Sequence, residues 1–259
     1  MNQLKKSDKE LTRGFVFAAS RHPAFYYSAM NLMDSIRDYW PDDQPEPKFA
    51  LFTEEWMADH RIEDVDYVQY VGNHIREKLY AMANSPWDIT FYMDADGVVE
   101  HEDIATVFDL LEDDDMKMVR LERDPISMGV FKEVYFETPE GEKADLELCG
   151  GVCLYRSCDP LVKEFMHDWN HMYREQENGQ WNDSGYPKSI LRWDQFTLWY
   201  LTNRVEKYKD MKIGKFEDNF RWNWFTSFRY NEDGTHRLVK DPPIFLHHSA
   251  SMDKALVVE

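Results

Sequence analysis

The feature that most constrains this chain is the alternation of short apolar runs with amphipathic segments through its first 120 residues. The apolar runs have the length of β-strands and cover residues 14–20, 48–56, 66–72 and 89–93. Apolar side chains recur at helical spacing in residues 24–39 and 73–87. Strands and helices that alternate in this way form parallel sheets flanked by helices. We therefore predict an α/β fold, with a mostly parallel central sheet and helices on both faces.

The second half of the chain continues this pattern and adds a hairpin. Helices are expected at residues 101–115, 159–176 and 192–203, and strands at 118–122 and 150–156. Residues 130–148 predict a small antiparallel β-hairpin, because Pro-Glu-Gly-Glu at 139–142 has turn composition. No repeat or composition break divides the 259 residues, so we expect a single domain. Its ends are predicted to be a polar tail at 1–13 and a C-terminal segment at 204–259 that closes the functional site.

The composition is acidic, with 49 acidic against 30 basic residues and a formal net charge of −19. This sign argues against binding to nucleic acid or an anionic membrane, since phosphate contacts need clusters of Lys and Arg. We expect no transmembrane segment, because no apolar run approaches the roughly 20 residues that one needs. The charged N-terminus also lacks the pattern of a signal peptide. The three clustered cysteines, Cys149, Cys153 and Cys158, are expected to be buried, reduced thiols, and we predict a cytoplasmic protein.

The predicted strand ITFYM at 89–93 is followed by Asp94–Ala95–Asp96. Two aspartates two residues apart on an extended chain end project the same way, and their hard oxygens suit Mg²⁺ or Mn²⁺. Ligands of open α/β sheets bind outside the carboxyl ends of the strands, where this pair would lie. A similar triplet at 64–66 opens a predicted strand instead of closing one. The alternative interpretation is that Asp94 and Asp96 simply form a solvated strand end.

The residues around this triplet resemble a known family. Residues 74–111 contain, in order, Lys78, then Ser85–Pro86–Trp87, then the aspartate pair, with Lys78 sixteen positions before Asp94. This segment resembles the donor-site region of nucleotide-sugar glycosyltransferases with the GT-A fold. It is most similar to glycosyltransferase family 8, the group of glycogenin and bacterial lipopolysaccharide galactosyltransferases. Further similarity is found in residues 14–30, 147–203 and 244–254.

The resemblance implies roles for residues along the whole chain. A divalent metal, Mn²⁺ or Mg²⁺, is implied to bind Asp94, Asp96 and His248, with His247 as a competing ligand. Asp194 and Gln195 are implied to face the transferred sugar as the catalytic pair. The residues implied to contact the nucleotide-sugar are Ala18, Ser20, Tyr26 or its neighbour Tyr27, Lys78, Ala95, Gly150, Gly151 and Lys254.

Two positions depart from the family pattern. Cys149 stands where the family usually has Asn, which puts a hydrogen bond to the sugar from this position in doubt. The Pro-Trp that usually follows the last lysine is replaced by Ala255–Leu256.

The function implied by the resemblance is metal-dependent transfer of a sugar, with a hexose expected. The donor would be a nucleotide-diphosphate sugar, with UDP expected, the acceptor a hydroxyl group, and the anomeric configuration retained. The metal would act as a Lewis acid on the leaving diphosphate, and Lys254 and Lys78 would add charge-assisted contacts to it. The donor sugar, the acceptor and the oligomeric state are not fixed by the sequence.

Other interpretations of the same residues stay open. The chain could be a catalytically silent carbohydrate- or protein-binding module on the same fold. It could also be a sugar nucleotidyltransferase, although residues 18–25 lack the glycines expected of such a loop. His167 and His171 have the i, i+4 spacing of zinc peptidases, but Asp168 follows the first of them where that mechanism needs Glu. Asp194 could be a helix first-turn residue, His248 a core histidine, and Lys78 a solvated helix residue.

Overall fold

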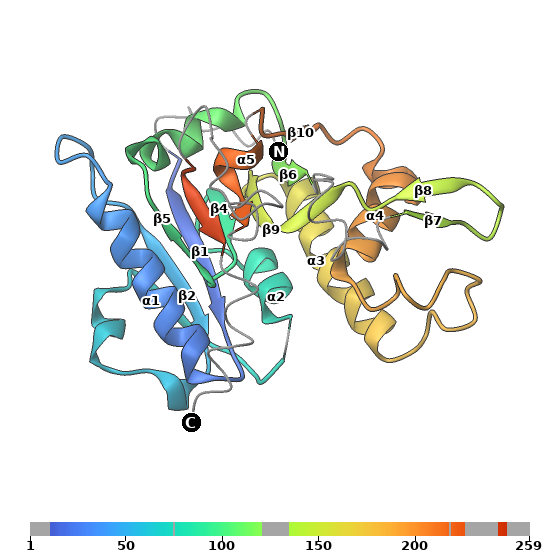
Figure 1. Ribbon diagram of the computed structural model, residues 1–259, viewed down its shortest axis with the longest axis horizontal. Coiled ribbons are helices and arrows are strands. Elements are labelled where there is room, and N and C mark those ends of the chain that lie inside the picture. The colour runs from blue at the N-terminus through green and yellow to red at the C-terminus, as the bar shows by residue number, and fades with distance from the viewer. Residues whose placement is uncertain (1–10, 75, 121–134, 218, 226–242, 248–259) are drawn as a thin grey trace, which may run out of the picture.

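The computed structural model describes residues 11–74, 76–120, 135–217, 219–225 and 243–247. Its central layer is a seven-stranded sheet with the strand order β10-β6-β9-β4-β1-β2-β3 (Figure 1). Neighbouring strands are parallel except around β9, which is antiparallel to both β4 and β6. The strands of this sheet are β1 Arg13–Ala19, β2 Phe49–Thr53, β3 Tyr67–Tyr70, β4 Ile89–Met93, β6 Met116–Arg120, β9 Leu148–Tyr155 and β10 Ile213–Lys215.

Helices cover both faces of the sheet, as the sequence predicts (Figure 1). The α-helices are α1 Pro23–Asp38, α2 Glu77–Ala83, α3 Pro160–Glu177, α4 Asp194–Arg204 and α5 Asn219–Trp222. Short 3₁₀ helices are η2 Glu55–Met57, η3 His60–Asp64, η4 Glu102–Leu111 and η6 Glu206–Tyr208. Helix α3 begins as expected, because Asp159 caps it by accepting the Leu161 N–H at 2.8 Å and Pro160 occupies the first turn.

Two apolar cores follow from the alternation of side chains along the strands. Phe15 and Phe17 of β1 pack with α1 and η4 on one face. Val16, between them, packs with α2 and α3 on the other face. Strand β4 is buried along its whole length, which explains why its sequence reads as a continuous apolar run.

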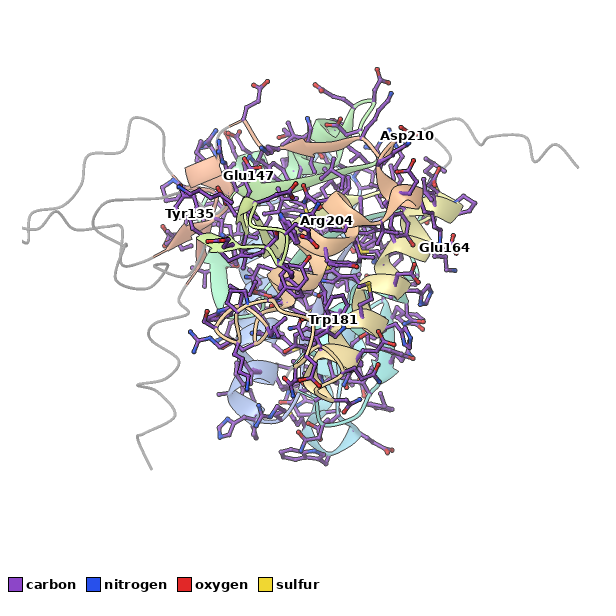
Figure 2. All side chains as sticks on the ribbon, turned by 90° about the vertical axis from the view of Figure 1, so that its right-hand side faces the viewer. Tyr135, Glu147, Glu164, Trp181, Arg204 and Asp210 are labelled. Carbon is purple, nitrogen blue, oxygen red and sulfur yellow. The ribbon has the colours of Figure 1, made fainter. Side chains whose placement is uncertain are left out.

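Two small sheets complete the fold. Strands β7 Tyr135–Glu137 and β8 Lys143–Asp145 form an antiparallel hairpin with its turn at 138–142, so the described part of the predicted hairpin is confirmed. The hairpin covers a third apolar cluster with α4 and the 178–193 connection, where Trp181 packs against it (Figure 2). The other small sheet joins β5 Gly97–Val99, β11 Trp224–Phe225 and β12 Phe245–His247.

Two predicted helices differ in the structure. Residues 102–111 form a 3₁₀ helix instead of an α-helix, although Ile104, Val107, Phe108 and Leu111 are buried as expected. Pairs of these residues lie three positions apart, a spacing that also fits 3.0 residues per turn. The helix predicted at 73–87 begins only at Glu77. The Arg76 N–H instead donates to Nδ1 of His74 at 3.0 Å, which satisfies it outside a helix.

Candidate functional site

The candidate site lies where β4 ends. The backbone N–H of Asp94 donates to the carbonyl of Gly151 at 2.8 Å, so strand pairing with β9 continues to the first aspartate. Ala95 and Asp96 then turn the chain into β5. Both aspartates therefore sit at the carboxyl end of a buried strand that runs parallel to β1, the position at which open α/β sheets bind ligands.

Tyr92 and Lys78 both contact the carboxylate of Asp94. The Tyr92 hydroxyl donates to its Oδ1 at 2.8 Å, and Nζ of Lys78 lies 3.5 Å from the same oxygen. Burial, and then the charge of Asp94, raises the pKa of Tyr92 well above its ordinary value, so the phenol stays protonated and keeps donating. The Asp94 side chain is 22% exposed, so it is partly accessible from solvent.

Lys78 reaches from the first turn of α2 into the middle of the site. Its ammonium lies 3.1 Å from Oδ2 of Asp194, 3.5 Å from Asp94 and 3.5 Å from the carbonyl of Gly150. The side chain is only 10% exposed, so this residue is a buried ion-pair partner and not a solvated helix residue.

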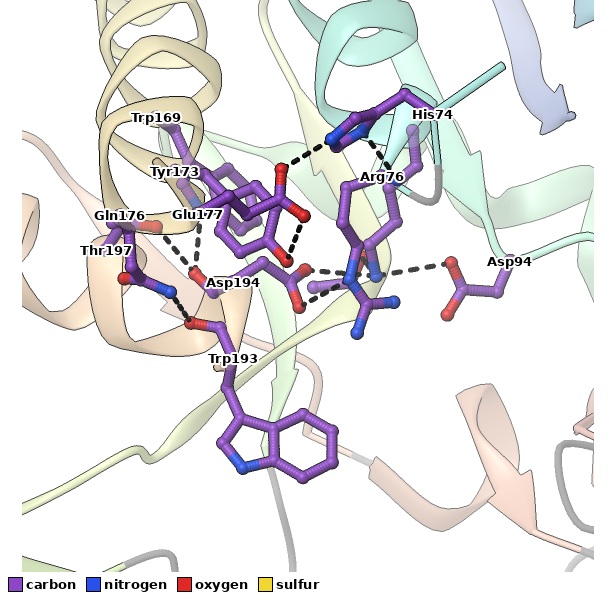
Figure 3. A network of polar contacts seen from close by, with 12 residues as sticks. His74, Arg76, Asp94, Trp169, Tyr173, Gln176, Glu177, Trp193, Asp194 and Thr197 are labelled. Carbon is purple, nitrogen blue, oxygen red and sulfur yellow. Dashed lines mark hydrogen bonds and ion pairs between the residues drawn. The ribbon is translucent and has the colours of Figure 1, made fainter. Parts of the chain in front are cut away.

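Asp194, the first residue of α4, is 1% exposed (Figure 3). Nε of Arg76 lies 3.5 Å from its Oδ1, the carboxylate oxygen that Lys78 does not approach most closely. Burial alone would raise the pKa of Asp194, but the charges of Lys78 and Arg76 lower it below its ordinary value. Neither carboxylate oxygen has a hydrogen bond of good geometry. The aspartate is thus a buried anion balanced by two cations.

The start of α4 is fixed by α3. Nε1 of Trp169 donates to the carbonyl of Asp194 at 2.9 Å, and the Thr197 hydroxyl donates to the same oxygen at 3.0 Å. The Gln176 side-chain amide donates to the carbonyl of Trp193 at 3.1 Å (Figure 3). The bonds from Trp169 and Gln176 tie the start of α4 to α3 and so fix the position of Asp194.

Gly150 and Gly151 make room for the two carboxylates. A Cβ on Gly151 would lie 2.8 Å from Oδ2 of Asp94, and one on Gly150 would lie 3.2 Å from Oδ2 of Asp194. The pairing of β9 with β6 shifts register at this point, between Met118 and Val119. The resemblance implies that the two glycines contact the donor sugar, and in the structure their lack of a side chain also leaves room for the protein's own aspartates.

Several residues of this site were missed from the sequence. They are Arg76, Tyr92, Trp169 and Tyr173, of which only Arg76 carries a charge. Arg76 and Lys78 stand two positions apart at the start of α2, and that paired charge is the signal that could have indicated both. Tyr92, Trp169 and Tyr173 are indistinguishable from core aromatics in the sequence.

The residues predicted to contact the nucleotide lie in β1, just after β1 and β4, and in α1. The Ser20 hydroxyl donates to the carbonyl of His74 at 2.7 Å, and Ala18 is partly exposed in β1. Ala95 is buried between the two aspartates. Tyr26 is fully buried and its hydroxyl donates to Asp59 at 2.8 Å, whereas Tyr27 is exposed. Of the two tyrosines considered, Tyr27 is therefore the one that offers surface to a ligand.

The cysteines occupy two environments. Cys149 and Cys153 are buried, as expected, but Cys158 is exposed, which corrects the prediction for it. Burial raises the pKa of Cys149 to about 11, so it is a neutral thiol, and the side-chain amide of Asn223 donates to its sulfur at 3.8 Å. A thiol is a weak hydrogen-bonding group, so Cys149 cannot replace the polar side chain usual at this position.

Two of the three predicted metal ligands are described. His248 and Lys254 lie outside the described residues. Strand β12 pairs with β5 and brings the backbone of His247 opposite Gly97, the residue after Asp96. Carboxylate oxygens are hard donors of the kind that Mn²⁺ and Mg²⁺ accept, so the chemistry of Asp94 and Asp96 fits a divalent ion. Within the described ranges, no group of three His, Cys, Asp or Glu side chains could hold a metal by itself.

Gln195, the two histidines of α3 and the expected lack of a transmembrane segment are the remaining predicted features. Gln195 follows Asp194, and its Oε1 is buried without a hydrogen-bond partner. His167 and His171 are exposed on α3, on the side away from its buried Phe165 and Trp169. Among the described residues, no helix is both long and apolar enough to cross a bilayer.

This topology, with its aspartates at the end of β4, is the GT-A glycosyltransferase fold. Among similar solved structures, the bifunctional glycosyltransferase WbbM superposes with a TM-score of 0.56 at 11% identity, over 94% of this chain and 47% of WbbM. An active-site mutant of the galactosyltransferase LgtC gives a TM-score of 0.51 at 16% identity, over 91% of this chain and 86% of LgtC. Mouse xyloside xylosyltransferase 1 gives 0.50 at 11% identity, over 92% of this chain and 98% of the enzyme.

The chain thus spans about half the length of WbbM and nearly the whole of the mouse enzyme. No model of a known protein family matches its sequence. No curated protein matches it either. With sequence identities of 11–16%, these similarities show a shared fold and nothing beyond it.

Proposed function

We propose that this protein is a metal-dependent glycosyltransferase that moves a sugar from a nucleotide-diphosphate donor to a hydroxyl acceptor. We further propose that the donor is a UDP-hexose and that the anomeric configuration is retained. The similar folds that we name above belong to glycosyltransferases, which supports sugar transfer as the general activity.

One observation carries the proposal. Two aspartates close a buried strand, and the first of them shares a lysine with a third, fully buried aspartate on α4. A solvated strand end needs no such arrangement, because exposed carboxylates are stable without partners. Burying Asp194 is costly unless it is paired, and perturbed charges of this kind cluster at functional sites.

The proposed roles follow the geometry. Asp94, Asp96 and His248 would hold Mn²⁺ or Mg²⁺, which when bound supplies Lewis-acid stabilisation to the departing diphosphate. Lys254 would add a charge-assisted contact to the same diphosphate. Tyr92 keeps one oxygen of Asp94 oriented through its 2.8 Å hydrogen bond.

Asp194 and Gln195 are the proposed sugar-facing pair. The orphaned Oε1 of Gln195 is an acceptor that a sugar hydroxyl could satisfy. The LgtC mutant with a similar fold replaces a glutamine by glutamate in its active site, which supports a role for a glutamine here. The positive charge that develops on the sugar during transfer favours a polar oxygen at its face.

The test is a panel of nucleotide-sugar donors incubated with the protein and Mn²⁺ or Mg²⁺, scored by release of nucleoside diphosphate. We expect release from a UDP-hexose, faster when a suitable hydroxyl acceptor is present. Binding of a donor without turnover would instead indicate a silent module, and no binding of any donor would refute the proposal.

A further inference from the structure

We propose that Arg76 binds the donor's diphosphate with the far side of its guanidinium while its Nε side faces Asp194. Arg76 would thus bridge a phosphate oxygen and the buried aspartate. This inference rests on the proposed function and assigns to it a residue that the sequence did not reveal.

The first step concerns Lys78, which was expected to contact the phosphates. An ammonium group has three N–H donors. The Lys78 nitrogen already faces three protein oxygens, of Asp194, Asp94 and Gly150, at 3.1 to 3.5 Å. The contact with Gly150 is a hydrogen bond, and the two carboxylates flank the ammonium as ion pairs, so the positive charge of Lys78 already offsets that of the two aspartates.

The second step is the geometry of Arg76. A guanidinium presents five N–H groups in a planar fork, so one edge can face a carboxylate while another faces a second anion. Nε of Arg76 faces Asp194 at 3.5 Å. Burial alone would lower the pKa of the guanidinium, but the charges of Asp194 and Asp94 and the contact with the Tyr173 hydroxyl raise it. In Figure 3 its two terminal nitrogens point away from Asp194, toward the side of Asp94. The side chain is 25% exposed, so this edge is within reach of a ligand.

The third step is the way in which Arg76 is held. Its backbone N–H donates to Nδ1 of His74, and the other ring nitrogen of His74 lies 2.5 Å from Oε2 of Glu177 on α3. The carbonyl of His74 accepts from Ser20 at the end of β1. The segment before α2 is thus tied to two elements, which pre-orders the arginine for binding.

The fourth step is the charge of the site. Asp94, Asp96 and Asp194 bring three negative charges, and Lys78 brings one positive charge to two of them. A diphosphate adds negative charge to this region of an acidic protein. A divalent ion would offset part of it, and a second, adjacent cation is needed at the phosphates themselves. Among the described residues of this network, Arg76 is the cation whose terminal N–H groups point away from Asp194 and whose side chain is partly exposed.

The experiment compares the wild type with Arg76→Gln and Arg76→Lys. The affinity for UDP, GDP, CDP and ADP is measured by calorimetry with Mn²⁺, and that for the parent nucleosides by ligand-observed NMR. We expect Arg76→Gln to weaken binding of the cognate diphosphate by roughly 10- to 100-fold. Its nucleoside should bind as before. Arg76→Lys should restore only part of the affinity, because a point charge cannot bridge two anions.

The matched control is Arg174→Gln, which removes an arginine of α3 that pairs with Glu77 at 3.4 Å, outside the Asp194 contacts. It should leave the diphosphate affinity unchanged. The proposal is overturned if Arg76→Gln binds the diphosphate as tightly as the wild type. It is equally overturned if diphosphate and nucleoside affinities fall together, which would indicate a merely structural role. If the wild type binds none of the four diphosphates, the proposed function itself fails.

Discussion

At the scale of single residues, the site depends on how closely two carboxylates pack against a strand. Asp94 and Asp194 both point at the Gly150–Gly151 pair of β9, and both contact Lys78. The three side chains come from β4, α4 and α2, so their meeting is a product of the tertiary fold. Small changes at any of them are expected to affect the site before they affect the fold.

Gly151→Ala tests this packing. The added methyl would lie 2.8 Å from Oδ2 of Asp94, closer than carbon and oxygen approach, so the carboxylate must move. We expect nucleoside diphosphate release to fall by at least about 10-fold, while stability drops by only about 1–3 kcal/mol. Gly72→Ala is the control, because its nearest neighbour would be 3.8 Å away. Wild-type activity in Gly151→Ala would contradict the proposed role of Asp94.

Asp194→Asn tests the buried ion pair through pH. Because the folded-state pKa of Asp194 lies below its ordinary value of 3.8, its ionised form stabilises the fold above that pH. The stabilisation is lost as the pH falls through the folded-state pKa. We expect the variant to be less stable than the wild type at pH 7 by about 3 kcal/mol, since two cations lose their partner.

The difference in unfolding free energy between the two proteins should shrink below about pH 4, where the carboxylate begins to gain a proton in the unfolded chain while it is still ionised in the folded one. Denaturant titrations at pH 7 and at acid pH measure it. A difference that is the same or larger at acid pH would show that the charge of Asp194 is not what stabilises the fold.

At the scale of elements, α3 is the support on which α4 presents the site. Trp169→Phe keeps an aromatic ring but removes the N–H that donates to the carbonyl of Asp194 at 2.9 Å. We expect a loss of about 1–3 kcal/mol in unfolding free energy. The rate of donor cleavage should fall while donor binding changes little, because only the sugar-facing end of α4 shifts. Unchanged rates in a folded Trp169→Phe protein would rule out this supporting role.

Most strands and helices of this chain were predicted from its sequence. The buried strands β1, β2 and β4 and the helices α1 and α3 appear within a few residues of their predicted bounds, because apolar runs and helical spacing report burial directly. The 3₁₀ form of 102–111 was not predictable, since its apolar spacing fits both kinds of helix. The late start of α2 depends on a local bond to His74 that no periodicity reveals.

The candidate site was predictable only in part. Asp94, Asp96, Asp194 and Lys78 were chosen from motif order, and the structure brings Asp94, Asp194 and Lys78 into contact. Arg76 was missed, because its position beside Asp194 depends on the conformation of the segment before α2. The phosphate contact predicted for Lys78 also depends on partners from β9 and α4 that sequence spacing cannot show.

At the scale of the whole molecule, the chain carries a net charge of −19, yet its proposed donor is an anion. The local cations of the site and a bound divalent ion would have to overcome this field. A long polyanion cannot benefit from one small cationic site. We therefore expect the protein to pass unretained through a heparin column at about 50 mM salt. Salt-dependent retention would reveal a basic surface that the described residues do not account for.

The central claim is that Asp94 and Asp96 support metal-dependent cleavage of a nucleotide-sugar. The most direct measurement is nucleoside diphosphate release from the best donor, after chelation and after return of Mn²⁺, in wild type, Asp94→Asn, Asp96→Asn and Asp64→Asn. Asp64 belongs to the Asp-x-Asp triplet at 64–66 and is exposed, so it is the matched control. We predict that Mn²⁺ restores release in wild type and Asp64→Asn but not in the two site variants. Equal, metal-independent release in all four proteins would contradict the account.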